Sequence, residues 1–326
     1  MSDILKKDVV AIGNAMVDVL IKSNLGIIKG YGINHDSMNL IDENKKNTLH
    51  NENQIHKMVA AGSAGNTIVG ISSFGGSGTF IGKISNDKIG KFFSEDIKNS
   101  GINFPLGISE SPISTGCCTI FVEDNGTRTM CTFLGTGSLI NDDDIKFEHI
   151  INHKITYLEG YLWDNKEAKS AMQKMIKIAK KDNQKIALTL SDKFCIDRHR
   201  DSFNELIKDH IDILFANEDE INSMFQLSEI EDSIERLKKM KIISAITRSE
   251  KGSVIISEGK DIRIEAAPVD KIVDTTGAGD YYAAGFLYGI ANGKSLEESA
   301  KYGSIAASEI ISHFGTRAEK QLSSLI

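Results

Sequence analysis

Short apolar runs alternate along this chain with longer segments in which apolar residues recur at helical spacing. A β-branched run that ends in glycine, such as residues 8–13, is typical of a buried strand. Strand character also appears at residues 78–84, 154–162, 185–191, 211–217, 242–249 and 253–259. Helical spacing appears at residues 88–101, 165–184, 233–241, 281–293 and 295–315. Strands that alternate with helices through short loops predict an α/β fold, in which a mostly parallel sheet has helices on both faces.

Two stretches break this alternation, at residues 16–40 and 112–135. The second contains Thr- and Phe-rich runs, and the pair Asn125-Gly126 between them is a strong hairpin signal. The two stretches predict a small β-sheet that forms a lid, built from segments of approximately 16–45 and 111–135. Because no repeat or Pro/Ser-rich linker divides the chain, we expect residues 1–326 to form one domain.

The composition is that of a soluble globular protein, with 40% hydrophobic and 25% charged residues among 326. A formal net charge of -7 argues against a nucleic-acid-binding face. The first residues lack the apolar core and cleavage site of a signal peptide, and nowhere do 18 apolar residues follow one another. We therefore expect a cytoplasmic protein with a small-molecule partner, without nucleic-acid or membrane partners.

The cysteines and acidic residues give no sign of a preformed metal site. Neither a C-x-x-C pair nor a His cluster at metal-ligand spacing occurs, so reduced thiols are expected. The sequence NDDDI, which begins at Asn141, is compatible with a divalent cation, but a solvated turn with a helix N-cap is the favoured interpretation. The four cysteines are Cys117, Cys118, Cys131 and Cys195.

One Gly-rich segment has the arrangement expected of a phosphate-binding loop. The Walker sequence G-x-x-x-x-G-K-[ST] is absent, and the glycines of residues 75–82 precede a strand, which indicates a turn. The sequence DTTGAGD at residues 274–280 instead opens the apolar helix predicted at 281–293. N–H groups at a helix start point outward, and the macrodipole adds positive charge there, so this loop can hold an anion such as a phosphate.

Asp280 lies in that opening turn and has two interpretations. An isolated Asp at this place most often caps the helix. Alternatively, its carboxylate accepts a proton from a hydroxyl while backbone N–H groups hold the phosphoryl oxygens. Positioning and charge stabilisation dominate phosphoryl transfer, so the base only needs to act as the new bond forms.

The motifs of the chain resemble, in order, those of the ribokinase-like (PfkB) carbohydrate and nucleoside kinases. DTTGAGD matches the family's C-terminal signature, and AAGSAGNTIVGISSFG matches its Gly-x-x-x-Asn element through Gly62 and Asn66. FIGKISNDKIGKFF, with Asp87 and Gly90, follows in the family's order, as do the N-x-x-E element ANEDE and the nucleotide-contacting turn AITRSEKG. The resemblance spans the chain from GNAMVD to HFGTR. It implies a three-layer α/β/α sandwich with a small β-sheet lid.

The resemblance also implies roles for the residues of the phosphate-binding loop. In that family the Asp of the signature is the general base, which gives Asp280 this role. Gly277, Ala278 and Gly279 would form the anion hole. ATP is the implied phosphate donor, and the residues assigned to it are Asn217, Thr247, Gly252, Gly279 and Gly315.

The same resemblance implies sites for metal ions. Asn217 and Glu220 would organise Mg²⁺ through water molecules, since Mg²⁺ keeps much of its hydration shell. Asp274 and Thr276, with carbonyls near Gly315, match the place where many members bind a monovalent cation. Stimulation by K⁺ is therefore a hypothesis.

On the acceptor side, Asn14 and Asp18 match the pair that holds sugar hydroxyls in the family, although a turn after the first strand is the alternative. A carboxylate suits two vicinal hydroxyls, because charge-assisted hydrogen bonds are strong. Arg128, in the lid hairpin, either reaches the transferred phosphate on closure or is a solvated turn residue. Gly62, Ser63 and Asn66 are expected to lie against the same sugar.

The identity of the acceptor is less constrained. TRTMCTFLG and EGYLWD resemble a bacterial branch of the family with adenosine kinase activity. Tyr161 and Trp163 would place an aromatic ring where it stacks on a purine, worth roughly 1–3 kcal/mol, or would simply pack the lid onto the core. Phosphorylation of the 5′-hydroxyl of adenosine is the leading hypothesis.

Other functions stay open at this point. A sugar kinase that acts on ribose, fructose or ketodeoxygluconate is the alternative enzyme, and a non-catalytic nucleoside or sugar sensor is the remote one. A dinucleotide-dependent oxidoreductase is disfavoured, because no G-x-G-x-x-G opens a helix after the first strand. The sequence is compatible with a monomer or a homodimer.

Overall fold

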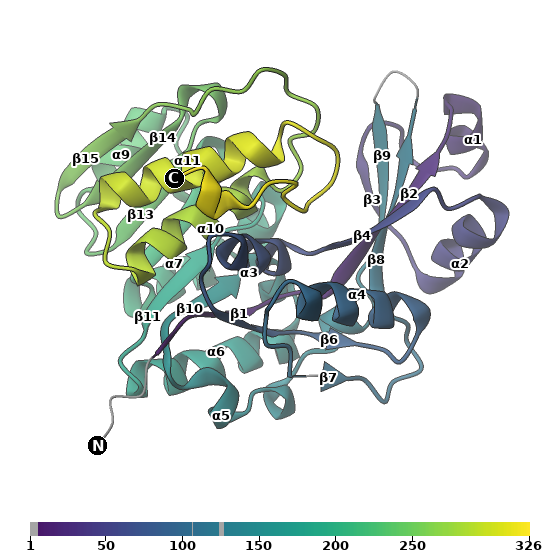
Figure 1. Cartoon of the computed structure of the whole chain (residues 1–326), viewed down its shortest axis with the longest axis horizontal. Coiled ribbons are helices and arrows are strands. Elements are labelled where there is room, and N and C mark those ends of the chain that lie inside the picture. The colour runs from purple at the N-terminus through teal and green to yellow at the C-terminus, as the bar shows by residue number, and fades with distance from the viewer. Residues whose placement is uncertain (1–5, 106, 124–126) are drawn as a thin grey trace.

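The computed structural model describes residues 6–105, 107–123 and 127–326, and its larger sheet is mostly parallel (Figure 1). Its strands from β5 to β13 run parallel, and the last two join antiparallel. In spatial order they are β15 (Lys260–Ile264), β14 (Ser253–Ser257), β13 (Ile243–Thr247), β12 (Ile213–Asn217), β11 (Lys185–Thr189), β10 (His153–Glu159), β1 (Lys7–Ile12) and β5 (Gly78–Ile81).

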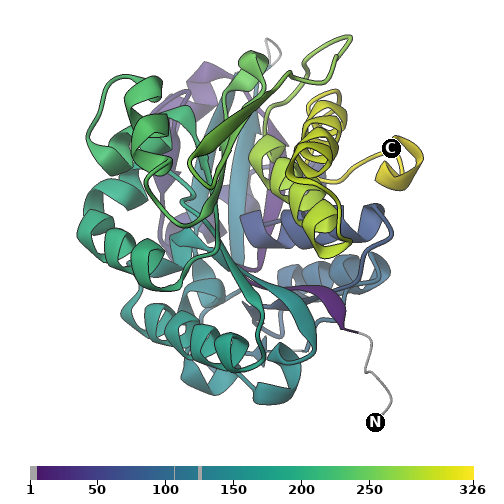
Figure 2. The ribbon, with the colours of Figure 1, turned by 90° about the vertical axis from the view of Figure 1, so that its left-hand side faces the viewer.

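Helices cover both faces of this sheet, which gives the three layers seen in Figure 2. One face carries α5 (Phe147–Ile150), α6 (Lys166–Lys181), α7 (Lys193–His210), α8 (Glu218–Phe225) and α9 (Ile230–Leu237). The other carries α3 (Ser63–Ser73), α4 (Lys88–Asn99), α10 (Ala278–Ala291) and α11 (Leu296–Ile310).

The period of two along each strand divides the core between these layers. Val10 and Ile12 of β1 pack with α6 and α7, whereas Val9 and Ala11 pack with α3 and α10. All four side chains are fully buried, so β1 reads as a continuous apolar run. The three-layer α/β/α fold expected from the sequence is confirmed.

A second, smaller sheet stands beside the carboxyl end of β1 (Figure 1). One face of this sheet packs on two helices, where Ile21, Phe121 and Cys131 contact Ile28 and Leu49. In spatial order its strands are β3 (Met38–Leu40), β9 (Arg128–Phe133), β8 (Gly116–Val122), β2 (Met16–Lys22) and β4 (Lys57–Ala61), and its helices are α1 (Leu25–Gly30) and α2 (Glu43–Glu52).

The opposite face of the small sheet turns toward the larger one and is only half covered. Met16, Asp18 and Leu20 of β2 share this face and alternate with the buried residues of the same strand. Register pairing adds Met130 of β9, which lies opposite Met38 of β3. A half-apolar, half-exposed surface therefore surrounds the Asp18 carboxylate.

Several elements differ from the sequence-based expectation. The run at 78–84 divides into β5 and a separate strand β6 (Lys83–Ile84), which pairs with β7 (Gly107–Ile108). The run at 154–162 ends as a strand at Glu159 and continues as a 3₁₀ helix, η3 (Gly160–Asp164). The small sheet includes β4, which lies outside the segments expected to form the lid. The predicted Asn125-Gly126 turn lies outside the described residues.

Two expectations about side-chain chemistry are confirmed. The four cysteines are free and buried. Asn141 caps the 3₁₀ helix η2 (Asp142–Asp144) in a capping box with Asp144, which accounts for the acidic run. Within the part of the chain that the structure describes, no group of three His, Cys, Asp or Glu residues is arranged to hold a metal ion.

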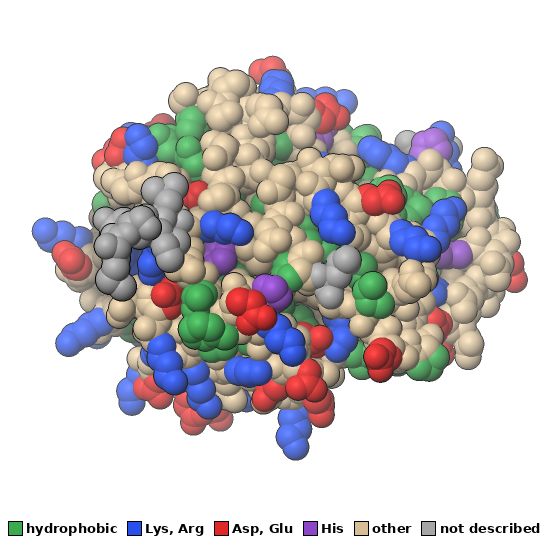
Figure 3. All heavy atoms as spheres, turned by 60° about the horizontal axis from the view of Figure 1, so that its bottom comes forward, with side chains coloured by type: hydrophobic (Ala, Val, Ile, Leu, Met, Phe, Trp, Pro, Cys, Tyr) green, Lys and Arg blue, Asp and Glu red, His purple; other side chains and the backbone are tan. Residues whose placement is uncertain are grey.

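The surface and helix lengths agree with the composition. On the face drawn in Figure 3, Lys and Arg side chains are interspersed with Asp and Glu side chains. Of the described helices, none combines the length and apolar character that a membrane crossing requires.

The small residues of α10 let it approach two helices closely. A Cβ added at Gly285 would overlap the backbone of Tyr302 and Gly303 in α11, and one added at Gly70 of α3 would overlap Ala284. These close contacts add to the packing of Ala283 and Ala284, which lie in the same core cluster as Val9 of the larger sheet. They hold the start of α10 firmly in the layer beside α3.

Replacing Gly285 with Ala tests this close approach. Because the added methyl group has no space, we expect overpacking to lower the free energy of unfolding by about 1–3 kcal/mol, measured by denaturant titration. Gly30→Ala is the matched control, since a Cβ there meets nothing within 4 Å, and it should change stability by no more than about 0.5 kcal/mol. Equal stability of the two variants would contradict the packing argument.

Candidate active site

Polar residues gather where the parallel strands of the larger sheet end. Asn14 follows β1, Glu159 ends β10, and Asn217 ends β12 beside its register neighbour Thr247 of β13. The carboxyl ends of parallel strands meet at one edge, where ligands bind in open α/β sheets. This edge faces the small sheet and is the candidate active site.

Asp280 lies at the centre of this edge, in the first turn of α10. Ser63 Oγ donates a hydrogen bond to Asp280 Oδ1 (2.6 Å), and Asn66 Nδ2 donates to Oδ2 (2.8 Å). Thr67 Oγ1 also donates to the Asp280 backbone carbonyl (3.1 Å), which ties the starts of α3 and α10 together. The structure thus brings Asp280 together with Ser63 and Asn66, although Asp280 is more than 200 positions from both in the sequence.

The local backbone leaves the start of α10 open for an anion. Gly277 caps the helix with a left-handed backbone (φ 83°), which glycine adopts without strain. A Cβ added at Gly279 would meet nothing within 4 Å, so open space borders the backbone there. First-turn N–H groups have no partner within their own helix, so those of Gly279 and Asp280 can face a phosphate.

Burial controls the protonation of the Asp280 carboxyl. Desolvation raises its pKa to about 6, while the hydrogen bonds from Ser63 and Asn66 and the charge of Arg317 lower it. A carboxylate with a pKa near neutrality is a stronger base than an ordinary Asp and is still ionised at pH 7. The geometry and the pKa both suit proton acceptance from a nearby hydroxyl.

Glu159 is a site residue that the sequence analysis missed. It is 1% exposed and accepts hydrogen bonds from Asn14 Nδ2 (2.7 Å), the Asn14 N–H (3.2 Å) and the Ala64 N–H (2.9 Å). Burial raises its pKa to about 7, and these hydrogen bonds lower it. In the sequence this Glu lies inside a run of strand residues, and nothing there indicates that it orients Asn14.

Asn14 and Gly62 are fixed against each other. A Cβ at Gly62 would overlap the Asn14 carbonyl oxygen, and Gly62 also has a left-handed backbone (φ 95°), so both conditions require glycine. The amide of Asn14 is anchored through its Nδ2 atom on Glu159, which directs its Oδ1 atom toward the loop at Gly137. Asn14 therefore presents a hydrogen-bond acceptor at the edge of the cleft.

Asp18 lies on the face of β2 that turns toward the carboxyl edge of the larger sheet. Burial raises its pKa to about 7; Arg317 and Arg128 lower it, whereas Asp274 and Asp280 raise it. Asp274, Asp280 and Arg317 belong to the segments around α10 and α11, and Arg128 belongs to β9. Asp18 therefore faces the carboxyl edge of the larger sheet. Asp18 and Asn14 thus lie on two sides of one space.

Arg128 reaches from the small sheet to the loop before α10. Its Nη1 donates to Asp274 Oδ1 (2.8 Å) and to Thr276 Oγ1 (3.3 Å), and its guanidinium lies over the Phe314 ring. Of the two interpretations from the sequence, a solvated turn residue does not fit these contacts. The ion pair joins the small sheet to the Gly-rich loop before α10.

The predicted monovalent-cation residues do come together around Asp274. Besides Arg128, the Asp274 carboxylate accepts hydrogen bonds from Thr276 N (3.1 Å), Thr276 Oγ1 (2.8 Å) and Gly315 N (3.3 Å). Gly315 has a backbone φ of 103°. A monovalent cation that used this carboxylate would compete with the guanidinium of Arg128.

Asn217 and Glu220 form a capping box at the start of α8. Asn217 Nδ2 and the Asn217 N–H donate to the two carboxylate oxygens of Glu220 (2.7 and 3.0 Å), and the Glu220 N–H donates back (2.8 Å). Burial raises the pKa of Glu220 to about 7. Because both of its oxygens are engaged, this pair fits a hydrated Mg²⁺ held through water better than direct ligation.

The turn between β13 and β14 contains two predicted nucleotide-site positions. Thr247 is the last residue of β13. A Cβ added at Gly252 would overlap the Ile264 carbonyl oxygen of β15, so packing alone requires glycine at this position. Ser249 stands where the related motif often has glycine, and its φ of 52° is left-handed. The turn thus keeps a glycine-like backbone despite the substitution.

The two aromatic residues predicted near the acceptor differ in position. Trp163 is 3% exposed, stacks on Phe203 and donates from Nε1 to Ser202 (2.8 Å), so it belongs to the core and cannot stack on a purine. The expectation of a Trp163 stacking site is wrong, because residues 160–164 coil into η3 and direct this ring inward. Tyr161 is 38% exposed at the strand end, where its hydroxyl donates to Ser191 O (3.3 Å).

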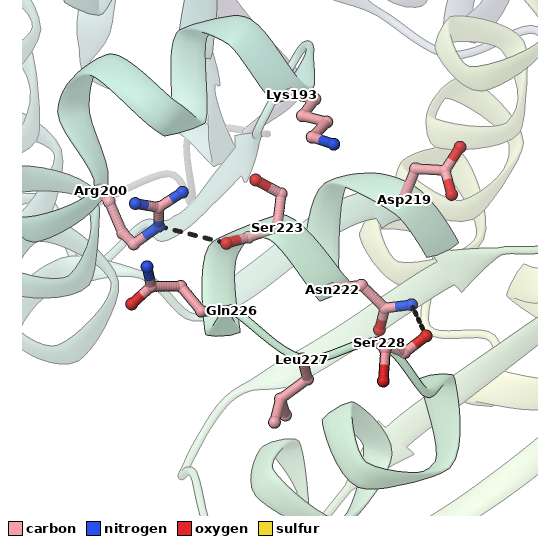
Figure 4. A pocket seen from close by; sticks show the side chains of 8 residues that line it. All are labelled: Lys193, Arg200, Asp219, Asn222, Ser223, Gln226, Leu227 and Ser228. Atoms are coloured by element: carbon pink, nitrogen blue, oxygen red, sulfur yellow. Dashed lines mark hydrogen bonds between the residues drawn. The ribbon is translucent and has the colours of Figure 1, made fainter.

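A surface groove lies between α7 and α8 (Figure 4). Arg200 Nε donates to the Ser223 carbonyl (3.1 Å), and Asn222 Nδ2 donates to the Ser228 carbonyl (3.4 Å), so part of its polar lining is already bonded. None of the site residues predicted from the sequence lines it. Its lining residues are Lys193, Arg200, Asp219, Asn222, Ser223, Gln226, Leu227 and Ser228.

Comparison with known proteins agrees with this geometry. The sequence model of the pfkB family carbohydrate kinases matches residues 31–322. The structure of adenosine kinase from Sinorhizobium meliloti is similar to the chain with a TM-score of 0.91 and 36% identity, over 98% of each chain. A probable sugar kinase from Rhizobium etli is similar with a TM-score of 0.91 and 35% identity, over 99% of this chain and 98% of that one.

A curated relative broadens the range of activities. The 5-dehydro-2-deoxygluconokinase of Bacillus licheniformis is 25% identical over 323 residues, 94% of this chain and 90% of the relative. The range matched by the family model contains the Gly-rich start of α10, and the two solved structures are similar over nearly the whole chain. The chain therefore belongs to the pfkB family of carbohydrate kinases, enzymes that phosphorylate hydroxyl groups of sugars or nucleosides.

Proposed function

We propose that this kinase transfers the γ-phosphoryl group of ATP to the 5′-hydroxyl of adenosine, giving AMP and ADP. The observation that carries the proposal is the surface around Asp18, which combines a carboxylate for a ribose diol with half-exposed apolar side chains for a base. Likeness to the adenosine kinase of Sinorhizobium meliloti supports it.

In the proposed reaction Asp280 accepts the proton of the acceptor hydroxyl as its oxygen attacks the γ-phosphorus. The N–H groups of Gly279 and Asp280, at the start of α10, hold the oxygens of the transferred group, since the Ala278 N–H already donates to the Thr275 carbonyl (3.2 Å). Ser63 and Asn66 keep the carboxylate oriented through the hydrogen bonds described above, and each carboxylate oxygen retains a second lone pair for the hydroxyl.

On the acceptor side, Asp18 accepts hydrogen bonds from two vicinal ribose hydroxyls and Asn14 Oδ1 accepts a further one. The cleft suits a neutral acceptor, because its two guanidinium groups are already paired: Arg317 with Asp96 and Arg128 with Asp274. A sugar acid or a sugar phosphate would meet several carboxylates, while Arg128 and Arg317 are already paired with other acidic residues. This charge balance favours a nucleoside or a neutral sugar.

The apolar part of the surface favours the nucleoside. Leu40 is 67% exposed and Met38 is 48% exposed on β3, next to the half-exposed Met130 of β9. A sugar alone would leave these side chains in water, whereas a purine ring would cover them. Tyr161 at the end of β10 is a second apolar surface for the base.

A sugar kinase is the alternative, since relatives include the 5-dehydro-2-deoxygluconokinases and a probable sugar kinase. Among the sugars, the charge balance of the cleft favours ribose or fructose over ketodeoxygluconate. ATP is the donor that the family implies, and bound Mg²⁺ would neutralise phosphate charge near Asn217 and Glu220. Stimulation by K⁺ stays a prediction, with Arg128 as the competing cation on Asp274.

Acceptor preference is the first test of the proposal. In an ADP-release assay with adenosine, inosine, ribose, fructose and ketodeoxygluconate, we expect kcat/KM for adenosine to exceed that for ribose by about 10- to 100-fold, the contribution of base contacts. Reactions without acceptor correct for ATP hydrolysis. Turnover of free sugars without turnover of adenosine would refute the nucleoside proposal.

A pair of variants tests the apolar surface in the same assay. Met130→Gln should raise KM for adenosine and leave KM for ribose unchanged, because only the base reaches this side chain. Leu25→Gln, on the helix-covered side of the small sheet, is the control and should alter neither value.

The role of Asp280 is tested by Asp280→Asn. We expect kcat to fall by about 10³-fold, within the range of general-base contributions, because the amide cannot accept the proton. ATP affinity and the melting temperature check that the variant folds. Asp143→Asn, in the exposed turn before α5, is the control. A variant that retains more than about a tenth of kcat would exclude Asp280 as the base.

The pH dependence follows from the direction of the pKa shifts. Burial raises the pKa of Asp280 to about 6, and only the ionised carboxylate can accept a proton. With saturating adenosine, kcat should therefore be constant above pH 7 and fall about tenfold per pH unit below pH 6. A constant kcat between pH 4.5 and 7.5 would show that no such base limits the reaction.

A further inference from the structure

Arg317, like Glu159, is a charged residue of the site to which the sequence analysis assigned no role. It follows α11, and its side chain is 18% exposed. Nε and Nη2 donate to Asp96 Oδ2 of α4 (3.0 and 2.9 Å), while Nη1 donates to Asn66 Oδ1 (2.6 Å) and to the Thr316 carbonyl (2.9 Å). The guanidinium thus connects α4 to α3 directly behind Asp280.

The contact with Asn66 determines which way its amide points. A guanidinium has only donors, so the Asn66 carbonyl oxygen must face it. The Asn66 NH₂ group is then left for Asp280 Oδ2, to which it donates at 2.8 Å. With the amide reversed, NH₂ would face the guanidinium and the oxygen would face the carboxylate, and both contacts would be repulsive.

Arg317 also acts electrostatically on two acidic groups of the site. Its charge lowers the pKa of both Asp280 and Asp18. Arg128, the other cation of the cleft, acts on Asp18 and is paired with Asp274. The titratable groups that interact electrostatically with Asp280 are Asp18, Tyr157, Glu159, Tyr161, Glu220, Tyr281 and Arg317.

We propose that Arg317 is a positioning residue for phosphoryl transfer: anchored on Asp96, it holds the Asn66 amide in the one orientation that aims the Asp280 carboxylate at the acceptor hydroxyl. The inference rests on the proposed role of Asp280 as base. It assigns Arg317 no contact with substrate, because four of its five N–H donors are engaged with Asp96, Asn66 and Thr316.

A double-mutant cycle tests this coupling. Arg317→Gln and Asn66→Ala should each lower kcat, the former by about 10²-fold, the effect of a misplaced reacting group. If Arg317 acts through Asn66, the double variant should be no more than about twofold slower than Asn66→Ala alone, because coupled residues are not additive. Multiplicative losses would overturn the proposal.

The pH dependence of kcat distinguishes this role from a purely structural one, because a purely structural role would leave the pH dependence unchanged. At saturating acceptor, Arg317→Gln should shift the acid limb of kcat upward by about one pH unit, since losing a nearby positive charge raises a carboxyl pKa. Part of the lost activity should then return at higher pH, and Arg317→Lys should retain more of it than Arg317→Gln. A lower kcat with an unmoved limb would overturn the proposal.

Two controls separate folding and base chemistry from positioning. Arg317→Gln leaves the Asp96 carboxylate unpaired. The double variant Arg317→Gln/Asp96→Asn also removes the Asp96 charge, and its melting temperature and ATP affinity should match those of the wild type. Arg198→Gln removes an exposed ion pair with Asp164 and should leave kcat and its pH limb unchanged. Asp280→Asn tests the base itself, so an active Asp280→Asn would refute the proposed base independently of the Arg317 cycle.

Discussion

The arrangement of the site depends on one half-buried carboxylate held between the starts of two helices. Asp280 lies in the first turn of α10 and receives hydrogen bonds from Ser63 and Asn66 in the first turn of α3. Helix starts carry partial positive charge, so both helices favour the ionised form, while burial opposes it. The balance leaves the pKa of Asp280 at about 6.

The close packing of α10 on α3 and α11 fixes the position of the Asp280 carboxylate. Gly285 and the adjacent small residues let α10 lie against α11 and α3 without intervening side chains. Because α10 is packed on two sides, its first turn keeps its position when a negatively charged phosphate binds. Preorganised donors of this kind stabilise a developing charge without reorganisation during the reaction.

Acidic groups accumulate around the cleft, and the fold compensates for them locally. Asp18, Glu159 and Glu220 are each buried enough that their pKa values rise to about 7. Glu159 and Glu220 are bonded to amide groups, and Arg128 and Arg317 are paired with Asp274 and Asp96. Burial without such partners would cost several kcal/mol for each charge. The small sheet contributes Asp18 and Arg128, so the site needs both sheets.

The sequence by itself determined the alternation of strands and helices, the three layers and the place of DTTGAGD at a helix start. These features follow from local periodicity and from the backbone freedom of glycine, which are properties of short segments. The residues of the acceptor and nucleotide edge could be named only because their motifs resemble those of a known family; they occupy strands, strand ends and a helix start. The same local reasoning explains why the acidic turn at Asn141 was recognised as a cap.

Only the tertiary structure decided which of these residues meet. Glu159 and Arg317 carry no local signal, and their roles arise because β10 and the segment after α11 end beside α3. Trp163 was misplaced because a 3₁₀ turn, rather than a continued strand, directs its ring into the core. Long-range contacts of this kind depend on how distant segments pack, and a pattern read along one segment contains no information about its partners.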